Sequence, residues 1–215
     1  MARGPAVQLF PLDELTPPAG PQTPRLAPKS LTATFMIIFP EQLSIPIRNH
    51  KTGRIYTVVR ADAVDPTADR ISEVVSISNE PEVYDRLFKQ LLGGHPYPRE
   101  KAVDWFRSIS EDWRTGGHFR FFVLDASGAI RAACGIKSND PDGAEMGYLS
   151  SSFHTGIMTN AVVAISGAAK AAGFRSLVCR VNLGNLRSIA VVRRAGFLPD
   201  ETRADESRGC FIIRL

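Results

Sequence analysis

The feature that most constrains this chain is a stripe of small residues at 156–172, which lies between two strand-like segments. Residues 145–150 and 176–182 have the apolar content of strands, whereas the segment between them repeats small apolar residues at helical spacing. A stripe of this kind lets a helix lie close against a sheet. Its members are Ile157, Ala161, Ala164, Ile165, Ala168 and Ala172. A strand, a helix and a strand in this order predict an α/β architecture.

Hydrophobic periodicity predicts the remaining elements. The expected strands or β-like segments are residues 35–39, 43–47, 55–59, 119–124, 130–136, 197–198 and 210–215. The expected helices are residues 69–78, 82–92, 100–113 and 185–195. From residue 54 the order is β-α-α-α-β-β-β-α-β-α-β-β. This order describes a mixed sheet with helices on both faces.

The 215 residues correspond to one domain with additions at its start. Residues 1–30 form a Pro-rich arm that holds seven of the 15 prolines, and residues 31–53 form an extra β segment before the main domain at 54–215. The arm is either a dispensable tail or a segment that packs on the domain or on a partner. Packing would start from the apolar residues Val7, Leu9, Phe10 and Leu12.

Composition excludes several classes of protein. The net charge of +4 comes without a Lys/Arg run, an RNP-like motif or zinc-finger spacing, so we expect no nucleic-acid partner, and the mild positive field suits a polyphosphate ligand. Cys134, Cys179 and Cys210 lack CxxC spacing and indicate reduced thiols in a cytoplasmic protein. The four histidines show no ligand spacing, so we expect no metal. No apolar stretch approaches the ~20 residues of a membrane span, and the start lacks a secretory h-region.

Three short motifs follow one another in a fixed order. The strand sequence EMGYL at 145–149 precedes a glycine-containing turn, HTG at 154–156, that leads into a helix. The segment NLRS at 185–188 follows, and GF at 196–197 ends the next helix. A helix N-terminus has unpaired N–H groups and the positive end of its dipole, so it binds anions, and a glycine lets a pyrophosphate approach the backbone.

This order resembles the GNAT superfamily of acyl-CoA-dependent N-acyltransferases, and within it the RimJ/RimL-like branch. Members there read roughly E-I-G-Y, then Q/R-x-x-G-x-G/A running into T-E-A, and later N-x-x-S with G-F. This chain has EMGY at 145–148, SSFHTG at 151–156, TNA at 159–161 and NLRS at 185–188. His154, Ser151 and Asn160 depart from the family pattern. The resemblance covers residues 54–215 and implies a mixed, mostly antiparallel sheet that splays in a V.

The resemblance also implies an acyl-CoA site. The donor substrate would be acetyl-CoA or another short acyl-CoA, with its pyrophosphate against the N–H groups of residues 154–159. The implied cofactor-binding residues are Leu149, Ser150, Ser151, His154, Thr155, Gly156, Ile157, Met158, Thr159 and Asn185. Two alternatives stay open for His154: a strained conformation with φ > 0, or φ < 0 with the imidazole reaching a phosphate.

Catalysis in such a family requires an amine base and a proton for the departing thiolate. Ser188 is the candidate donor to the sulfur; its alternative is a buried hydroxyl bonded to the carbonyl four residues back. Glu145 is the candidate base acting through water; its alternative is a solvated or salt-bridged glutamate. Asn185 is an N-cap that would also contact the pantetheine arm. Tyr148 fits a packing residue with a polar tip better than an acid.

The sequence thus predicts a GNAT-like N-acyltransferase that moves an acetyl or other short acyl group to a primary amine. The acceptor is either a small molecule or a protein N-terminus. The acids of loop 200–205 are compatible with a cationic amine. The alternative function is a non-catalytic acyl-CoA-binding or regulatory module on the same fold. A homodimer is one assembly that stays open.

Overall fold

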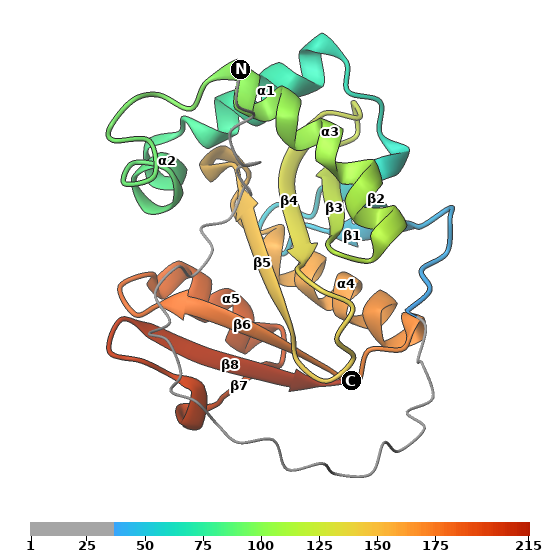
Figure 1. The fold of residues 1–215 in the computed structure, drawn as a ribbon, viewed down its shortest axis with the longest axis vertical. Helices are drawn as coiled ribbons and strands as arrows, with labels where there is room; N and C mark the ends of the chain where they lie inside the picture. The colour runs from blue at the N-terminus through green and yellow to red at the C-terminus, as the bar shows by residue number, and fades with distance from the viewer. Residues whose placement is uncertain (1–36) are drawn as a thin grey trace, which may run out of the picture.

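The computed structural model describes residues 37–215, so the Pro-rich arm and the first part of the extra β segment lie outside the described residues. One eight-stranded sheet forms the centre of the molecule (Figure 1), with the strand order β1-β2-β3-β4-β5-β6-β8-β7. The strands are β1 Ser44–Arg48, β2 Ile55–Arg60, β3 Phe119–Leu124, β4 Ile130–Ile136, β5 Ala144–Ser150, β6 Ser176–Asn182, β7 Leu198–Pro199 and β8 Arg208–Arg214.

Five α-helices and three short 3₁₀ turns complete the described part of the chain. The α-helices are α1 Ala68–Ser78, α2 Pro81–Leu87, α3 Arg99–Thr115, α4 Met158–Ala172 and α5 Leu186–Arg194. The 3₁₀ turns are η1 Ala61–Ala63, η2 Ser152–His154 and η3 Glu201–Arg203. Within residues 37–215, every helix is too short or too polar to cross a bilayer.

The sheet splays between β5 and β6. These two strands are the parallel pair of an otherwise antiparallel sheet, and they pair only at Ala144 with Leu177 and at Glu145 with Val178. Beyond Glu145, β5 stays paired with β4 but diverges from β6, as Figure 1 shows. The V-shaped sheet expected from the resemblance is therefore confirmed. The divergence leaves the backbone groups of residues 146–150 on the β6 side without a strand partner in the described chain.

Helices cover both faces of the sheet, as the sequence predicts. Helix α4 packs on one face, where Ala161, Ile165 and Ala169 are fully buried, and α5 packs against α4 and β6. Helices α1 and α3 pack on the other face. Strand β3 is buried on both sides, because Phe121 belongs to the core under α4 and its neighbour Phe122 to the core under α3.

Two predicted elements differ from the structure. Residues 37–39 of the predicted segment 35–39 have no regular structure; Phe39 instead packs its ring 5.0 Å from Phe119 and 5.4 Å from Trp113. The helix predicted at 82–92 ends at Leu87 and continues as turns. Phe88 causes this ending, because its ring is buried 4.8 Å from Tyr97 and its backbone leaves the helical conformation.

Strand β1 belongs to the same sheet as the main domain. Its full length pairs with β2, so the boundary predicted at residue 54 falls in the turn between the two strands. Asn49 organises that turn: its side-chain oxygen accepts hydrogen bonds from the N–H groups of Lys51 and Thr52 at 2.8 and 3.1 Å. Its side-chain nitrogen donates to the Thr155 carbonyl at 3.1 Å. The β1–β2 turn is thereby fixed beside the loop that precedes α4.

Candidate active site

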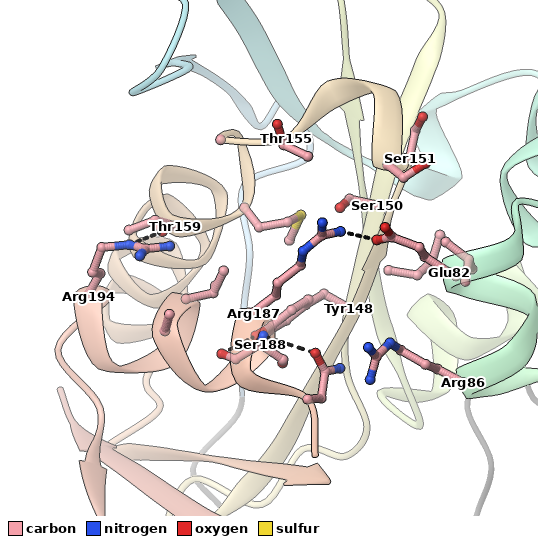
Figure 2. A pocket seen from close by; sticks show the side chains of 18 of the residues that line it. Glu82, Arg86, Tyr148, Ser150, Ser151, Thr155, Thr159, Arg187, Ser188 and Arg194 are labelled. Carbon is pink, nitrogen blue, oxygen red and sulfur yellow. Dashed lines mark hydrogen bonds and ion pairs between the residues drawn. The ribbon is translucent and has the colours of Figure 1, made fainter. Parts of the chain in front are cut away.

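A cavity of about 380 Å³ opens where β5 leaves β6. Its walls come from the end of β5, the start of α4, the first turn of α5, helix α2 and the β1–β2 turn (Figure 2). Eight of the ten predicted cofactor-binding residues line it. They are Leu149, Ser150, Ser151, Thr155, Gly156, Met158, Thr159 and Asn185. The other two do not: Ile157 is fully buried in the core, and His154 contacts Tyr56.

The start of α4 has the properties of an anion site. Ile157 precedes the helix and supplies no side-chain cap, so the first-turn N–H groups remain unpaired in the described structure. Gly156 has φ +101°, and a Cβ there would lie 2.5 Å from Oδ1 of Asn49. The turn therefore needs glycine. It brings the backbone of 155–156 and the N-terminus of α4 to the cavity, where a phosphate group fits the dipole.

His154 has the negative φ of the second arrangement considered from the sequence, but its imidazole contacts Tyr56. No non-glycine residue in the described part of the chain has a positive φ, so His154 is unstrained. Its Nδ1 lies 2.9 Å from the Tyr56 hydroxyl, and the residue does not line the cavity. Burial is the main cause that lowers the pKa of His154, which keeps the imidazole neutral.

Two cations flank the start of α4, and neither was identified from the sequence. Lys51 lies in the β1–β2 turn with its Nζ 3.4 Å from the Thr155 hydroxyl. Arg194 lies near the end of α5 with its Nε 3.3 Å from the Thr159 hydroxyl. Both residues line the cavity. Their charges add to the helix dipole on either side of the site where a pyrophosphate would bind.

An ion pair reaches across the same cavity. Figure 2 shows Arg187, from α5, extending to the carboxylate of Glu82, from α2. The two side chains are 68% and 50% exposed, and both line the cavity. Arg86 lies nearby on α2 and points toward the same space (Figure 2). A ligand that fills this cavity must displace or share the Arg187–Glu82 contact.

Tyr148 and Ser188 meet at the inner end of the cavity. Their hydroxyl oxygens are 2.7 Å apart. The Tyr148 hydroxyl also donates a hydrogen bond to the Ser188 carbonyl oxygen at 3.2 Å. Asn185 caps α5, because its Oδ1 accepts from the Ser188 N–H at 3.2 Å. Burial raises the pKa of Tyr148, and the hydrogen bond from Ser188 offsets this only in part. The phenol therefore stays protonated at neutral pH.

A second cavity of about 660 Å³ adjoins the first. Tyr148, Asn185 and Ser188 line both cavities, as do Arg86 and Leu87. Glu145 lines only the second, where Lys137 bonds one of its carboxylate oxygens and Arg180 Nε lies 3.7 Å from the other. The structure thus shows the salt-bridged state of Glu145. A base role would require one of these cations to move away.

The described cysteines and acids offer neither a nucleophile nor a metal site here. Cys179 lines the second cavity, but burial raises its pKa, so it remains a thiol. All three cysteines are free, and Cys134 is equally buried. Residues 37–215 contain no group of three or more His, Cys, Asp or Glu side chains arranged to hold a metal ion.

Residues 64–198 match the family model described as the acetyltransferase (GNAT) domain. The chain belongs to the GNAT acetyltransferase family. No curated protein sequence matches it.

Solved structures share this GNAT fold. The GNAT domain of S. lividans PAT is 18% identical, with a TM-score of 0.62 over 83% of this chain and all of that one. The microcin C7 self-immunity acetyltransferase MccE, solved with acetyl-CoA and AMP, is 15% identical, with a TM-score of 0.60 over 74% and 92%. A Salmonella typhimurium acetyltransferase that modifies the N-terminal serine of ribosomal protein L7/L12 is 14% identical, with a TM-score of 0.58 over 74% and 95%.

Proposed function

We propose that this GNAT domain transfers an acetyl group from acetyl-CoA to a primary amine. The observation that carries the proposal is the junction of the two cavities. The two cavities adjoin, and they share Tyr148, Asn185 and Ser188. A donor thioester in the first cavity and an amine in the second would meet beside two hydroxyl groups.

The first cavity suits the donor. The N–H groups at the start of α4, with Lys51 and Arg194 on either side, would hold the pyrophosphate. The unpaired edge of β5 at residues 146–150 offers backbone groups to the pantetheine amides. Asn185 uses only its Oδ1 as the helix cap, which leaves its side-chain N–H groups as donors toward the same arm.

The reaction needs two proton transfers at the junction of the two cavities: the amine loses a proton, and the departing sulfur gains one. The amine attacks the thioester carbonyl, the carbon–sulfur bond breaks, and the products are an N-acetylated amine and CoA. The attacking nitrogen loses a proton to water, with Glu145 as the proposed acceptor once Lys137 or Arg180 releases it. The sulfur takes a proton from the Ser188 hydroxyl, Tyr148 replenishes it across their 2.7 Å contact, and the proton that leaves the amine returns through water to Tyr148, so no net proton is gained or lost.

The test is acetyl-CoA titration followed by release of free CoA with a panel of amines, and mass spectrometry of the product. Binding with a product 42 Da heavier than the amine supports the proposal, on the mass of an acetyl group less one hydrogen. Ser188→Ala serves as the matched control, because it removes the hydroxyl while α5 and its Asn185 cap remain. Binding of acetyl-CoA without turnover of any amine would favour the alternative, a non-catalytic acyl-CoA-binding module.

A further inference from the structure

The second cavity has an excess of positive charge. Four cationic side chains line it, namely Arg86, Lys137, Arg180 and Arg208, against two carboxylates, Asp85 and Glu145. The cations come from α2, the end of β4, β6 and β8, so four separate elements direct positive charge to one cavity. Such convergence focuses a positive potential on the space between them.

The two carboxylates are already paired. Lys137, whose side chain is only 16% exposed, bonds Glu145, and Arg180 approaches the other oxygen of the same carboxylate. Asp85 accepts from Lys89 at 3.0 Å, and Lys89 does not line the cavity. Neither of these two acids therefore pairs with Arg86.

Arg86 occupies the position of most interest. It lines both cavities, and it makes no ion pair with any residue between 37 and 215. Figure 2 shows its guanidinium directed toward the junction, on the α2 side of Tyr148. An arginine in this position pairs readily with a planar or tetrahedral oxyanion, because its N–H groups form a fork.

We infer that the amine acceptor carries an anionic carboxylate or phosphate group, which Arg86 and Arg180 bind in the second cavity while the amine reaches the Tyr148–Ser188 junction. This inference rests on the proposed acetyl transfer and names its substrate class. It replaces the cationic amine considered from the sequence, because none of the acids in loop 200–205 lines either cavity.

The experiment compares acceptors that differ only in charge. Each of the twenty amino acids is offered as the free acid, as the amide and, where it exists, as the decarboxylated amine. Phosphoethanolamine and ethanolamine form the phosphate pair. For the acceptors that the enzyme acetylates fastest, we expect kcat/KM of the anionic form to exceed kcat/KM of its neutral counterpart at least tenfold. A preference confined to phosphoethanolamine would assign the oxyanion as phosphate, and a preference for the acids would assign it as carboxylate.

Arg180→Gln and Arg86→Gln identify the residues responsible. Each should lower the ratio of kcat/KM for the anionic acceptor to kcat/KM for its matched amide at least tenfold, mainly through KM for the anionic acceptor. Arg86 also lines the donor cavity, so KM for acetyl-CoA is measured for each variant. The inference is judged only on the ratio of kcat/KM for the anionic acceptor to kcat/KM for its neutral counterpart. Arg193→Gln is the matched control, since Arg193 lies on α5 but lines neither cavity.

Three outcomes would count against the inference. Equal or better turnover of amides, of decarboxylated amines or of a neutral N-terminal peptide would overturn it and leave acetyl transfer in place. Arginine variants with an unchanged anionic-to-neutral ratio would also overturn it. Absence of turnover with every class, although acetyl-CoA binds, would overturn the proposed function and this inference together.

Discussion

The hydroxyl oxygens of Tyr148 and Ser188 lie 2.7 Å apart, although the two residues are 40 positions apart in the chain. Tyr148 comes from β5 and Ser188 from the first turn of α5, so the contact joins the two sides of the splayed sheet. Ser188 therefore does not need to bond the carbonyl four residues back, which was its alternative role. A pair of hydroxyls at the junction of two cavities can pass a proton to a departing sulfur.

Removing either hydroxyl should slow turnover more than it weakens donor binding. Ser188→Ala is expected to lower kcat about 10–100-fold, the low end of acid–base contributions, with the Kd for acetyl-CoA changed less than threefold. Tyr148→Phe should produce a smaller loss, because Ser188 stays beside the sulfur. Since burial raises the pKa of Tyr148, its ionisation should cause no decline in kcat up to pH 9. Wild-type kcat in folded Ser188→Ala would remove Ser188 from the mechanism.

The cations beside α4 should determine donor affinity. Lys51→Gln and Arg194→Gln should each raise the Kd of CoA about 3- to 10-fold, or about 0.7–1.4 kcal/mol, because each removes a charge beside the pyrophosphate. Calorimetry at two salt concentrations checks this, since the difference from wild type should shrink at high salt. Arg193→Gln, one residue from Arg194 but outside the cavity, should bind CoA as wild type does. Equal effects of Arg193→Gln and Arg194→Gln would contradict the site-specific role.

Replacing Gly156, just before α4, by alanine should destabilise the protein, whereas replacing Gly167, within α4, should stabilise it. Gly156→Ala adds a Cβ at φ +101° and 2.5 Å from Asn49, so the free energy of unfolding should fall by about 1–2 kcal/mol or more. Affinity for CoA should fall with it, because Asn49 holds the turn that carries Lys51. Gly167→Ala, exposed in mid-helix with no atom near the added methyl, should stabilise by up to about 1 kcal/mol. Denaturant titration of both variants measures the signs, and a neutral Gly156→Ala would show that the turn tolerates a side chain.

Local patterns predicted most of the helices and strands, and they placed most of the candidate donor-binding residues at one cavity. The strands at 119–124, 130–136 and 176–182 have the expected bounds, because alternation and turn residues are encoded within each segment. Eight of the residues predicted to bind the donor line one cavity, because the motif spans β5, α4 and the start of α5 in fixed order. Gly156 is the one position in it where backbone geometry itself demands the residue.

The remaining site residues could not be found this way. Lys51 reaches the start of α4 because hydrogen bonds tie the β1–β2 turn to residues 155–160, among them the bond from Asn49 to the Thr155 carbonyl across 106 residues. The positive second cavity depends on four elements that meet only in the folded sheet, and Arg86 by itself resembles any exposed helical arginine. Likewise, the end of α2 at Leu87 is set by burial of Phe88 against Tyr97, a tertiary effect that overrides helical spacing.

The free energy of unfolding should decrease as the pH falls below 6.5, because His118 is buried in its neutral form. Burial, with Arg120 and Lys137 as further causes, lowers the pKa of His118 from 6.5 to about 3. The unfolded chain therefore binds a proton that the native state does not, and the stabilisation present above pH 6.5 is lost as pH falls toward 3. The free energy of unfolding should lose up to about 1.4 kcal/mol per pH unit from this group. Urea titrations from pH 7.5 to 4.5 test this prediction. The free energy of unfolding of His118→Asn should fall less steeply with decreasing pH than that of wild type, and an identical dependence on pH would reject the assignment.

The Arg187–Glu82 ion pair should compete with the donor for its cavity. Glu82 is the acid that lines the first cavity within the described residues, and it holds Arg187 across the space. Glu82→Gln removes a repelling charge and releases a cation toward the phosphates, so the Kd of CoA should fall about two- to fivefold. That gain corresponds to about 0.4–1 kcal/mol, the scale of an exposed ion pair. Glu82→Asp keeps the charge and should bind CoA within twofold of wild type. Weaker binding by Glu82→Gln than by Glu82→Asp would mean that the pair organises the cavity for the donor, and that Glu82 supports binding instead of opposing it.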